Sequence, residues 1–153
     1  MLVQPANVSV VLNDMPAYDP ALALSEEQND KWAKVMALRD DVNKALELAR
    51  ESGVKKNQDA DLTLSFDGEG WKEFQAMDLD ESEVAALCIV SAVKVQEGAD
   101  GVAGENFPGL TVRVAPAAGE KCPRCWNHSA AIGTPGHHVE LCDRCAKVVA
   151  VEW

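Results

Sequence analysis

The chain has 153 residues, 47% of them hydrophobic, which is enough for one ordinary domain or two small ones with a core. Its net charge of -11 argues against a protein that coats nucleic acid with a generally basic surface. It has neither a run of about 18 apolar residues nor the basic region and apolar core of a signal peptide, so we expect a cytoplasmic protein outside the membrane.

The first part of the chain predicts an extended lead-in followed by a long helix. Residues 1–24 contain three prolines and no sustained helical period. Ser25 begins the sequence SEEQ, a capping box with Gln28 at the third helical position. A helix should follow over residues 26–52 and end at Gly53. On the helical wheel, one half is apolar, with Trp32, Val35, Met36, Leu38, Val42, Ala45, Leu46 and Ala49, and the other is polar, with Asp40, Asp41, Lys44 and Glu47.

The middle of the chain predicts a small unit of strands and helices. Alternating polarity and apolar runs indicate, in order, a strand over 61–66, helices over 68–77 and 80–88, a buried strand over 88–95, a loop, and a strand over 109–116. Cys88 lies in an apolar run and is expected to be a buried thiol. Trp71 and Phe74 have helical spacing and are expected in the core rather than in an exposed patch.

Four of the five cysteines form two Cys-x-x-Cys pairs, Cys122 with Cys125 and Cys142 with Cys145. In a reducing compartment this pattern indicates metal ligation rather than disulfides. Four thiolates fill the tetrahedron that zinc prefers and leave no open position. We therefore predict one structural Zn²⁺ that supplies most of the folding energy of this segment. Two tight turns should present the thiols, joined by a hairpin whose tip is residues 133–136.

Other uses of these thiols stay open. A redox Cys-x-x-Cys motif usually occurs singly beside a strand–helix unit. A rubredoxin-like iron centre also takes two thiol pairs, so the spacing alone does not separate zinc from iron. The histidines at 128, 137 and 138 could replace a cysteine ligand. Because the tetrad is already complete, we expect His128, His137 and His138 to face solvent.

The stretch GEKCPRCWNHS…HHVELCDRCAKVV resembles the C-terminal zinc finger of bacterial isoleucyl-tRNA synthetases, and the run Cys-x-Arg-Cys-Trp is a specific feature of that group. The stretches ALRDDVNKALELAR and SEVAALCIVSAVKV are similar, in the same order, to the end of the anticodon-binding domain and the segment that follows it. The formamidopyrimidine-type DNA glycosylases share the cysteine spacing. Those enzymes carry a catalytic proline directly after the first methionine, where this chain has MLVQP.

The resemblance implies an α+β chain with a long amphipathic helix, a small mixed strand and helix unit, and a C-terminal zinc-ribbon-like finger. It implies three parts: the end of a helical anticodon-binding domain over 1–57, the small unit over 58–118, and the finger and tail over 119–153. The His-x-Gly-His and Lys-Met-Ser-Lys-Ser motifs of such synthetases are not in this sequence. No catalytic residue is therefore assigned, and ATP would act only through a catalytic domain outside this sequence.

The function that the resemblance implies is to hold the anticodon stem-loop of isoleucine tRNA for aminoacylation by the catalytic part of the synthetase, with the chain as a monomer. RNA contacts are implied for Arg124 and Trp126, which flank Cys125, and for Arg39. Aromatic rings and arginine planes stack on single-stranded bases. Residues 120–148 carry four basic side chains against three acidic ones, so they escape the acidic excess of the chain.

Each of these assignments has an alternative. Trp126 could cover the metal site, and Arg39, inside the apolar half of the long helix, could pair with a buried acid. Lys55 and Lys56 could be solvated, and Trp153 could be a docked tail or an unstructured end. For the whole chain, the alternative function is a zinc-ribbon module that binds proteins without RNA specificity, which the acidic balance suits.

Overall fold

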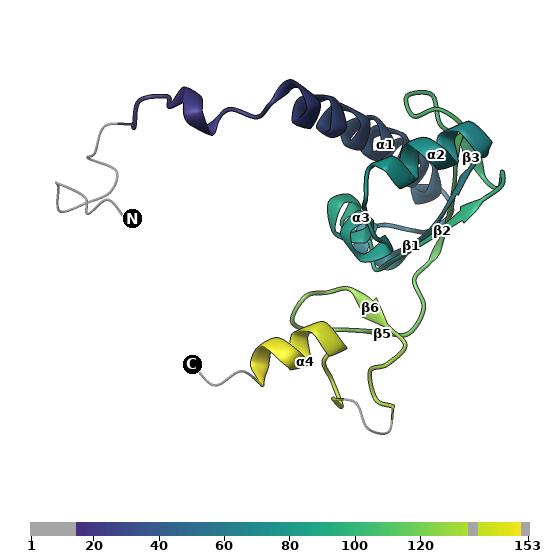
Figure 1. Ribbon diagram of the computed structural model, residues 1–153. Helices are drawn as coiled ribbons and strands as arrows, with labels where there is room; N and C mark the ends of the chain where they lie inside the picture. Colours follow the sequence, from purple (N-terminus) through teal and green to yellow (C-terminus); the bar gives the residue numbers. More distant parts are fainter. Residues whose placement is uncertain (1–14, 135–137, 151–153) are drawn as a thin grey trace.

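The computed structural model describes residues 15–134 and 138–150. Helices cover one face of a four-stranded sheet, and a small cysteine-rich finger lies beyond one end of the sheet (Figure 1). This arrangement confirms the predicted α+β class. Among the described helices, none combines the length and the apolar character needed to cross a bilayer. The predictions for residues 1–14, for positions 135 and 136 of the hairpin tip, for His137 and for Trp153 lie outside the described residues.

The long helix α1 spans Glu26–Arg50 and begins at the predicted capping box. The backbone N–H of Gln28 donates to Ser25 Oγ at 3.2 Å, and the backbone N–H of Ser25 donates to Gln28 Oε1 at 2.9 Å. Just past its end, Gly53 has a φ of +105°, a conformation that favours glycine. Within the described part of the lead-in, a single 3-10 turn occurs at Pro20–Leu22.

The sheet has the strand order β2-β1-β4-β3. Its strands are β1 (Ala60–Phe66), β2 (Ala92–Glu97), β3 (Val102–Ala103) and β4 (Leu110–Pro116). Strand β1 pairs in parallel with β2 and antiparallel with β4, so that Leu64 lies between Val95 and Val112. Parallel neighbours need a crossover connection, and here it consists of α2 (Gly68–Ala76) and α3 (Glu81–Cys88). The short strand β3 lies in the segment that the sequence predicts as a loop.

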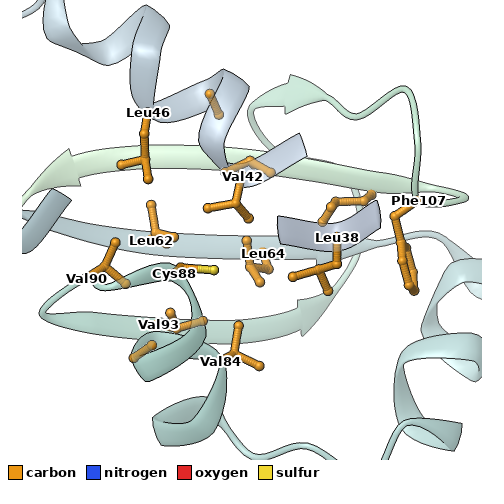
Figure 2. Packing of buried hydrophobic residues seen from close by; sticks show 14 of the residues in the cluster. Leu38, Val42, Leu46, Leu62, Leu64, Val84, Cys88, Val90, Val93 and Phe107 are labelled. Carbon is orange, nitrogen blue, oxygen red and sulfur yellow. The ribbon is translucent and has the colours of Figure 1, made fainter. Parts of the chain in front are cut away.

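The core lies between this sheet and the helices, as Figure 2 shows. Leu62 and Leu64 of β1 face it. The side chains that pack against them are Leu38, Val42 and Leu46 from α1 and Val84 and Cys88 from α3. Phe66 stacks on Phe74 with ring centroids 4.8 Å apart, and Trp71 packs beside them. The predicted core positions of Trp71, Phe74 and Cys88 are confirmed. Burial raises the pKa of the Cys88 thiol to about 11.

Asp41 departs from the prediction of the helical wheel, which places it on the polar half of α1. Its side chain is buried, and its carboxylate accepts hydrogen bonds from the backbone N–H groups of Glu105, Asn106 and Phe107 and from Asn106 Nδ2. Burial raises the pKa of Asp41, but these hydrogen bonds outweigh it and hold the pKa below its ordinary value. A Cβ at Gly104 would collide with this carboxylate. The loop before β4 is therefore anchored on α1.

Two apolar residues at the start of α1 depart from the prediction in the opposite sense. Trp32 and Met36 are assigned to the packed half of the wheel, yet both side chains are exposed. The first turns of α1 extend past the sheet (Figure 1), where they meet only the end of α2, through the ion pair of Lys34 with Glu73 among the described residues. Periodicity defines a face of a helix, but only the length of the neighbouring layer decides how much of that face is covered.

Residues 88–95 do not form one buried strand. Cys88 is the last residue of α3, and Ile89 has a φ of 59°, in the left-handed region that ends the helix. Strand β2 begins only at Ala92 and lies at the edge of the sheet, and Val93 is its buried residue. A short apolar run cannot be divided between helix and strand by its periodicity, which is why this prediction is wrong.

Candidate metal centre

The first cysteine pair lies in a tight turn between two short strands, β5 and β6, which pair antiparallel at Glu120–Lys121 and His128–Ser129. Within the turn, Cys122 N–H donates to the Asn127 carbonyl at 2.9 Å, and Trp126 N–H donates to the Cys122 carbonyl at 2.8 Å. Cys122 is buried and Cys125 is partly exposed. This hairpin brings both thiols to one side of the turn, as the Cys-x-x-Cys spacing predicts.

The second pair lies at the start of a helix, α4 (Asp143–Val149). Cys142 is its N-cap, and the Cys142 carbonyl accepts a hydrogen bond from Ala146 N–H at 2.9 Å. Cys145 lies in the first turn and is buried. The prediction of a second tight turn is therefore wrong for this pair, which lies at the start of a helix. The helical geometry still presents both thiols to the same point, because residues three apart share a face.

The four sulfur atoms form one cluster and lie within 4.8 Å of one another. The Sγ atoms of Cys125 and Cys142 are 3.7 Å apart. A regular tetrahedron of thiolates at about 2.3 Å from zinc has edges of about 3.8 Å, so the cluster has the size of a zinc site. Ile132 and Leu141 pack against it. Four protein ligands leave no position for a substrate, so such a site would be structural.

The thiols influence one another's ionisation strongly. Burial raises the pKa of Cys122, but hydrogen bonds from the backbone of Cys142, Cys125 and Arg124 lower it to about 6. At Cys142, burial together with hydrogen bonds to the neighbouring cysteines raises the pKa to about 12. One thiol therefore ionises readily while another keeps its proton. A divalent cation at the centre would favour the thiolate form of all four.

The described histidines make contacts outside this cluster. His128 Nδ1 lies 3.1 Å from the Gly119 carbonyl, and His128 Nε2 lies 3.3 Å from Asp59 Oδ1. His138 Nδ1 accepts hydrogen bonds from the next backbone N–H groups, those of Glu140 and Leu141. The expectation that His128 faces solvent is wrong, since its side chain is only 20% exposed. It forms part of the contact between the finger and the sheet.

The sequence did not predict the contact between the finger and the sheet. Asp59 lies just before β1, and its carboxylate Oδ1 is 2.6 Å from Lys121 Nζ of the finger. The backbone N–H of His128 donates to Ser91 Oγ at 2.6 Å, and the Ser91 hydroxyl donates to the Gln58 carbonyl. The hydrogen bond from Lys121, with a second from His128, holds the pKa of Asp59 below its ordinary value. An acid before a strand carries no local signal of partners more than 60 residues away.

Trp126 follows the first cysteine pair directly and points outward. It is 57% exposed and has a φ of 67°, which a non-glycine residue rarely adopts. The tight turn that closes on Cys122 imposes this conformation. Lys56, itself exposed, has its Nζ 5.8 Å from the centre of the Trp126 ring, within the range of a cation–π contact. The apolar side chains that pack on the cysteine cluster are those of Ile132 and Leu141.

The two arginines predicted to contact RNA have partners within the protein. Arg124 Nη1 lies 3.5 Å from Cys145 Sγ. Arg39 Nε donates to the Leu87 carbonyl at 3.1 Å, near the end of α3. Arg39 thus donates to a backbone carbonyl rather than to the buried acid that was the alternative. This hydrogen bond explains how a charged side chain is accommodated on the apolar half of α1.

Comparison with known proteins agrees with the cysteine geometry. Residues 119–148 match a family model described as a zinc finger found in FPG and IleRS. The chain is 37% identical over 142 residues to isoleucine–tRNA ligase of Staphylococcus haemolyticus, which covers 92% of this chain and 15% of that protein. It is 40% identical over 146 residues to the enzyme of Geobacter sulfurreducens, with 92% and 15% covered. For Syntrophotalea carbinolica the values are 40% over 122 residues, with 78% and 13% covered.

The fold and the cluster thus define an α+β chain with a finger of the FPG and IleRS zinc-finger family, and both support a structural zinc. More particularly, the chain is a relative of the isoleucine–tRNA ligases, and the predicted resemblance to the C-terminal region of isoleucyl-tRNA synthetases is confirmed. It spans only 13% to 15% of the length of these relatives.

Proposed function

We propose that the chain acts as the tRNA-binding C-terminal region of an isoleucyl-tRNA synthetase. It would hold the anticodon stem-loop of isoleucine tRNA while a catalytic part outside this sequence carries out aminoacylation with ATP. The observation that supports this proposal is the position of Trp126, an exposed indole that a constrained turn holds beside the cysteine cluster. Such a ring is a platform on which an unpaired base can stack.

The metal is part of the same proposal. Cys122, Cys125, Cys142 and Cys145 would bind one Zn²⁺, which joins the β5–β6 hairpin to α4. When bound, the ion supplies the positive charge that lets the four thiols ionise together. The role of the chain's own residues is to hold the turn in which Trp126 and Arg124 project. Zinc would therefore act on RNA binding only through the shape of this turn.

The charges around Trp126 suit an RNA contact despite the acidic chain. Lys56 lies over the indole, and Arg124 is on the same turn. Arg124 uses Nη1 for Cys145 and has further N–H donors with which to meet a phosphate. The lysine against one side of the ring would add positive charge where a stacked nucleotide carries its phosphate. The finger is thus the part of the chain in which the acidic excess is locally relieved.

Several parts of the proposal rest on the family alone. These are the RNA contact of Arg39, the division into residues 1–57, 58–118 and 119–153, the monomeric state and a cytoplasmic location. The structure adds one constraint on the division, since α1 shares a single core with the sheet. Any movement of the first part relative to the second would have to break that core.

The test is the affinity of Trp126→Ala for isoleucine tRNA, measured in the complete synthetase. Loss of one stacked base costs about 1–3 kcal/mol, which is roughly a five- to 150-fold weaker affinity. Trp126→Phe keeps an aromatic face and should recover most of the loss. Val139→Ala alters another exposed apolar side chain of the same finger and is the control. Zinc content should stay unchanged in all three variants.

Two results would contradict the proposal. If Trp126→Ala binds isoleucine tRNA normally but melts at a lower temperature, the indole is a structural residue. If the chain binds unrelated tRNA as well as isoleucine tRNA, or binds neither, a protein-interaction module becomes the better description.

A further inference from the structure

The two cysteine pairs share a pattern that zinc binding itself does not require. Both read Cys-x-Arg-Cys, over residues 122–125 and 142–145, with the arginine at the third position. Arg124 of the first pair lies with Nη1 3.5 Å from Sγ of Cys145, in the second pair. Arg144 of the second pair lies beside Cys125 of the first pair, on the same cleft. Each arginine therefore lies beside a cysteine of the opposite pair.

We propose that Arg124 and Arg144 form a crossed pair of positioning residues that neutralise the metal cluster and hold its two halves together. This inference rests on the proposed zinc assignment but not on tRNA binding. Four thiolates around Zn²⁺ carry two net negative charges, and two guanidinium groups, which stay protonated at any physiological pH, balance them. Partners of this kind orient metal ligands and tune the affinity for the metal.

The crossed geometry also protects the thiol that is most accessible. Cys125 is the partly exposed member of the tetrad, and it lines a cleft of about 540 Å³ between the finger and α3. Arg144 lines the same cleft. A guanidinium beside a zinc-bound thiolate withdraws electron density from the sulfur, so the sulfur is less available to an electrophile that enters the cleft. Loss of Arg144 should therefore raise the reactivity of the zinc-loaded finger as well as weaken its hold on the metal.

The test compares Arg124→Gln, Arg144→Gln and the double variant in the full chain. Lys147→Gln is the matched control, because it removes one positive charge from an exposed site on α4. Two readouts are used: competition for zinc with a chelator, and the rate at which iodoacetamide alkylates the zinc-loaded protein. Each arginine variant should bind zinc about tenfold more weakly and the double variant more weakly still. Arg144→Gln should be alkylated faster than the wild type.

The proposal would be overturned if both single variants kept the zinc affinity and the alkylation rate of the wild type. It would also be overturned if Lys147→Gln lost as much zinc affinity as the arginine variants, because that would indicate a general effect of charge. The lysine variants Arg124→Lys and Arg144→Lys keep the charge but not the planar fork. They are expected to bind zinc with an affinity between those of the wild type and the glutamine variants. If a glutamine variant does not fold, the lysine variant is compared with the wild type in its place. A wild-type chain that binds no zinc would instead refute the metal assignment.

Discussion

Asp59 Oδ1 lies 2.6 Å from Lys121 Nζ, which joins the residue before the first strand of the sheet to the first strand of the finger. The same oxygen lies 3.3 Å from Nε2 of His128, in the second strand of the hairpin. One carboxylate therefore contacts both strands of the finger. Since about one third of this side chain is exposed, the contact is expected to determine the orientation of the finger more than its stability.

Asp59→Asn should leave the core and the finger folded but let the finger reorient. The loss of stability should stay below about 1 kcal/mol, as for other exposed ion pairs. Residual dipolar couplings on the zinc-loaded chain would measure this, because the finger and the sheet would no longer share one alignment. The control is Asp100→Asn, which removes a similar pair with Arg113 at the sheet. An unchanged common alignment in Asp59→Asn would contradict the prediction.

Cys142→Ser, or removal of zinc by a chelator, should unfold the segment after about residue 120 and leave α1 and the sheet intact. The metal supplies most of the folding energy of so small a finger, whereas α1 and the sheet have a core of their own. Elemental analysis should find one zinc per wild-type chain, and amide spectra should show loss of the finger resonances alone. Iron in the purified chain, or finger resonances that survive in Cys142→Ser, would refute the ligand assignment.

Asp41→Asn should lower the free energy of unfolding by about 2–3 kcal/mol, because charge-assisted hydrogen bonds from three backbone N–H groups to the buried carboxylate are weakened. Asp40→Asn, one residue away and exposed, should have little effect. The folded pKa of Asp41 is lowered, so its contribution is present above the unfolded pKa and is lost as pH falls through the folded value. Denaturant titrations should therefore show the wild type and Asp41→Asn converging in acid. A gap that persists at low pH would show that charge is not the cause.

The isolated chain should not support isoleucine-dependent ATP–pyrophosphate exchange. Neither adenylate-forming motif of the related synthetases is in its sequence, and four-thiolate metal sites have no open position for a substrate. The assay needs protein prepared free of the host's own enzyme. Exchange that follows the chain through purification would show that it activates an amino acid by itself.

Local patterns were sufficient for the elements whose signals lie within a few residues. Ser25 and Gln28 identify the start of α1 because both partners of a capping box belong to the same turn. Leu62 and Leu64 identify β1 because the period of a strand is two. The cysteine tetrad is equally local in each half, since a Cys-x-x-Cys pair can present two thiols to one point whether it lies in the hairpin or at the start of α4.

Only the tertiary structure decided which partners the charged and polar side chains have. Asp41 is buried because the N–H groups of residues 105 to 107 meet it, more than 60 residues along the chain. His128 and Lys121 meet Asp59 across similar separations, and Arg124 meets Cys145 only when the two cysteine pairs have come together. Periodicity predicts which face of an element is apolar, because the spacing of apolar residues along the sequence defines that face. A hydrogen bond between distant residues depends on how the elements are packed, which no local pattern contains.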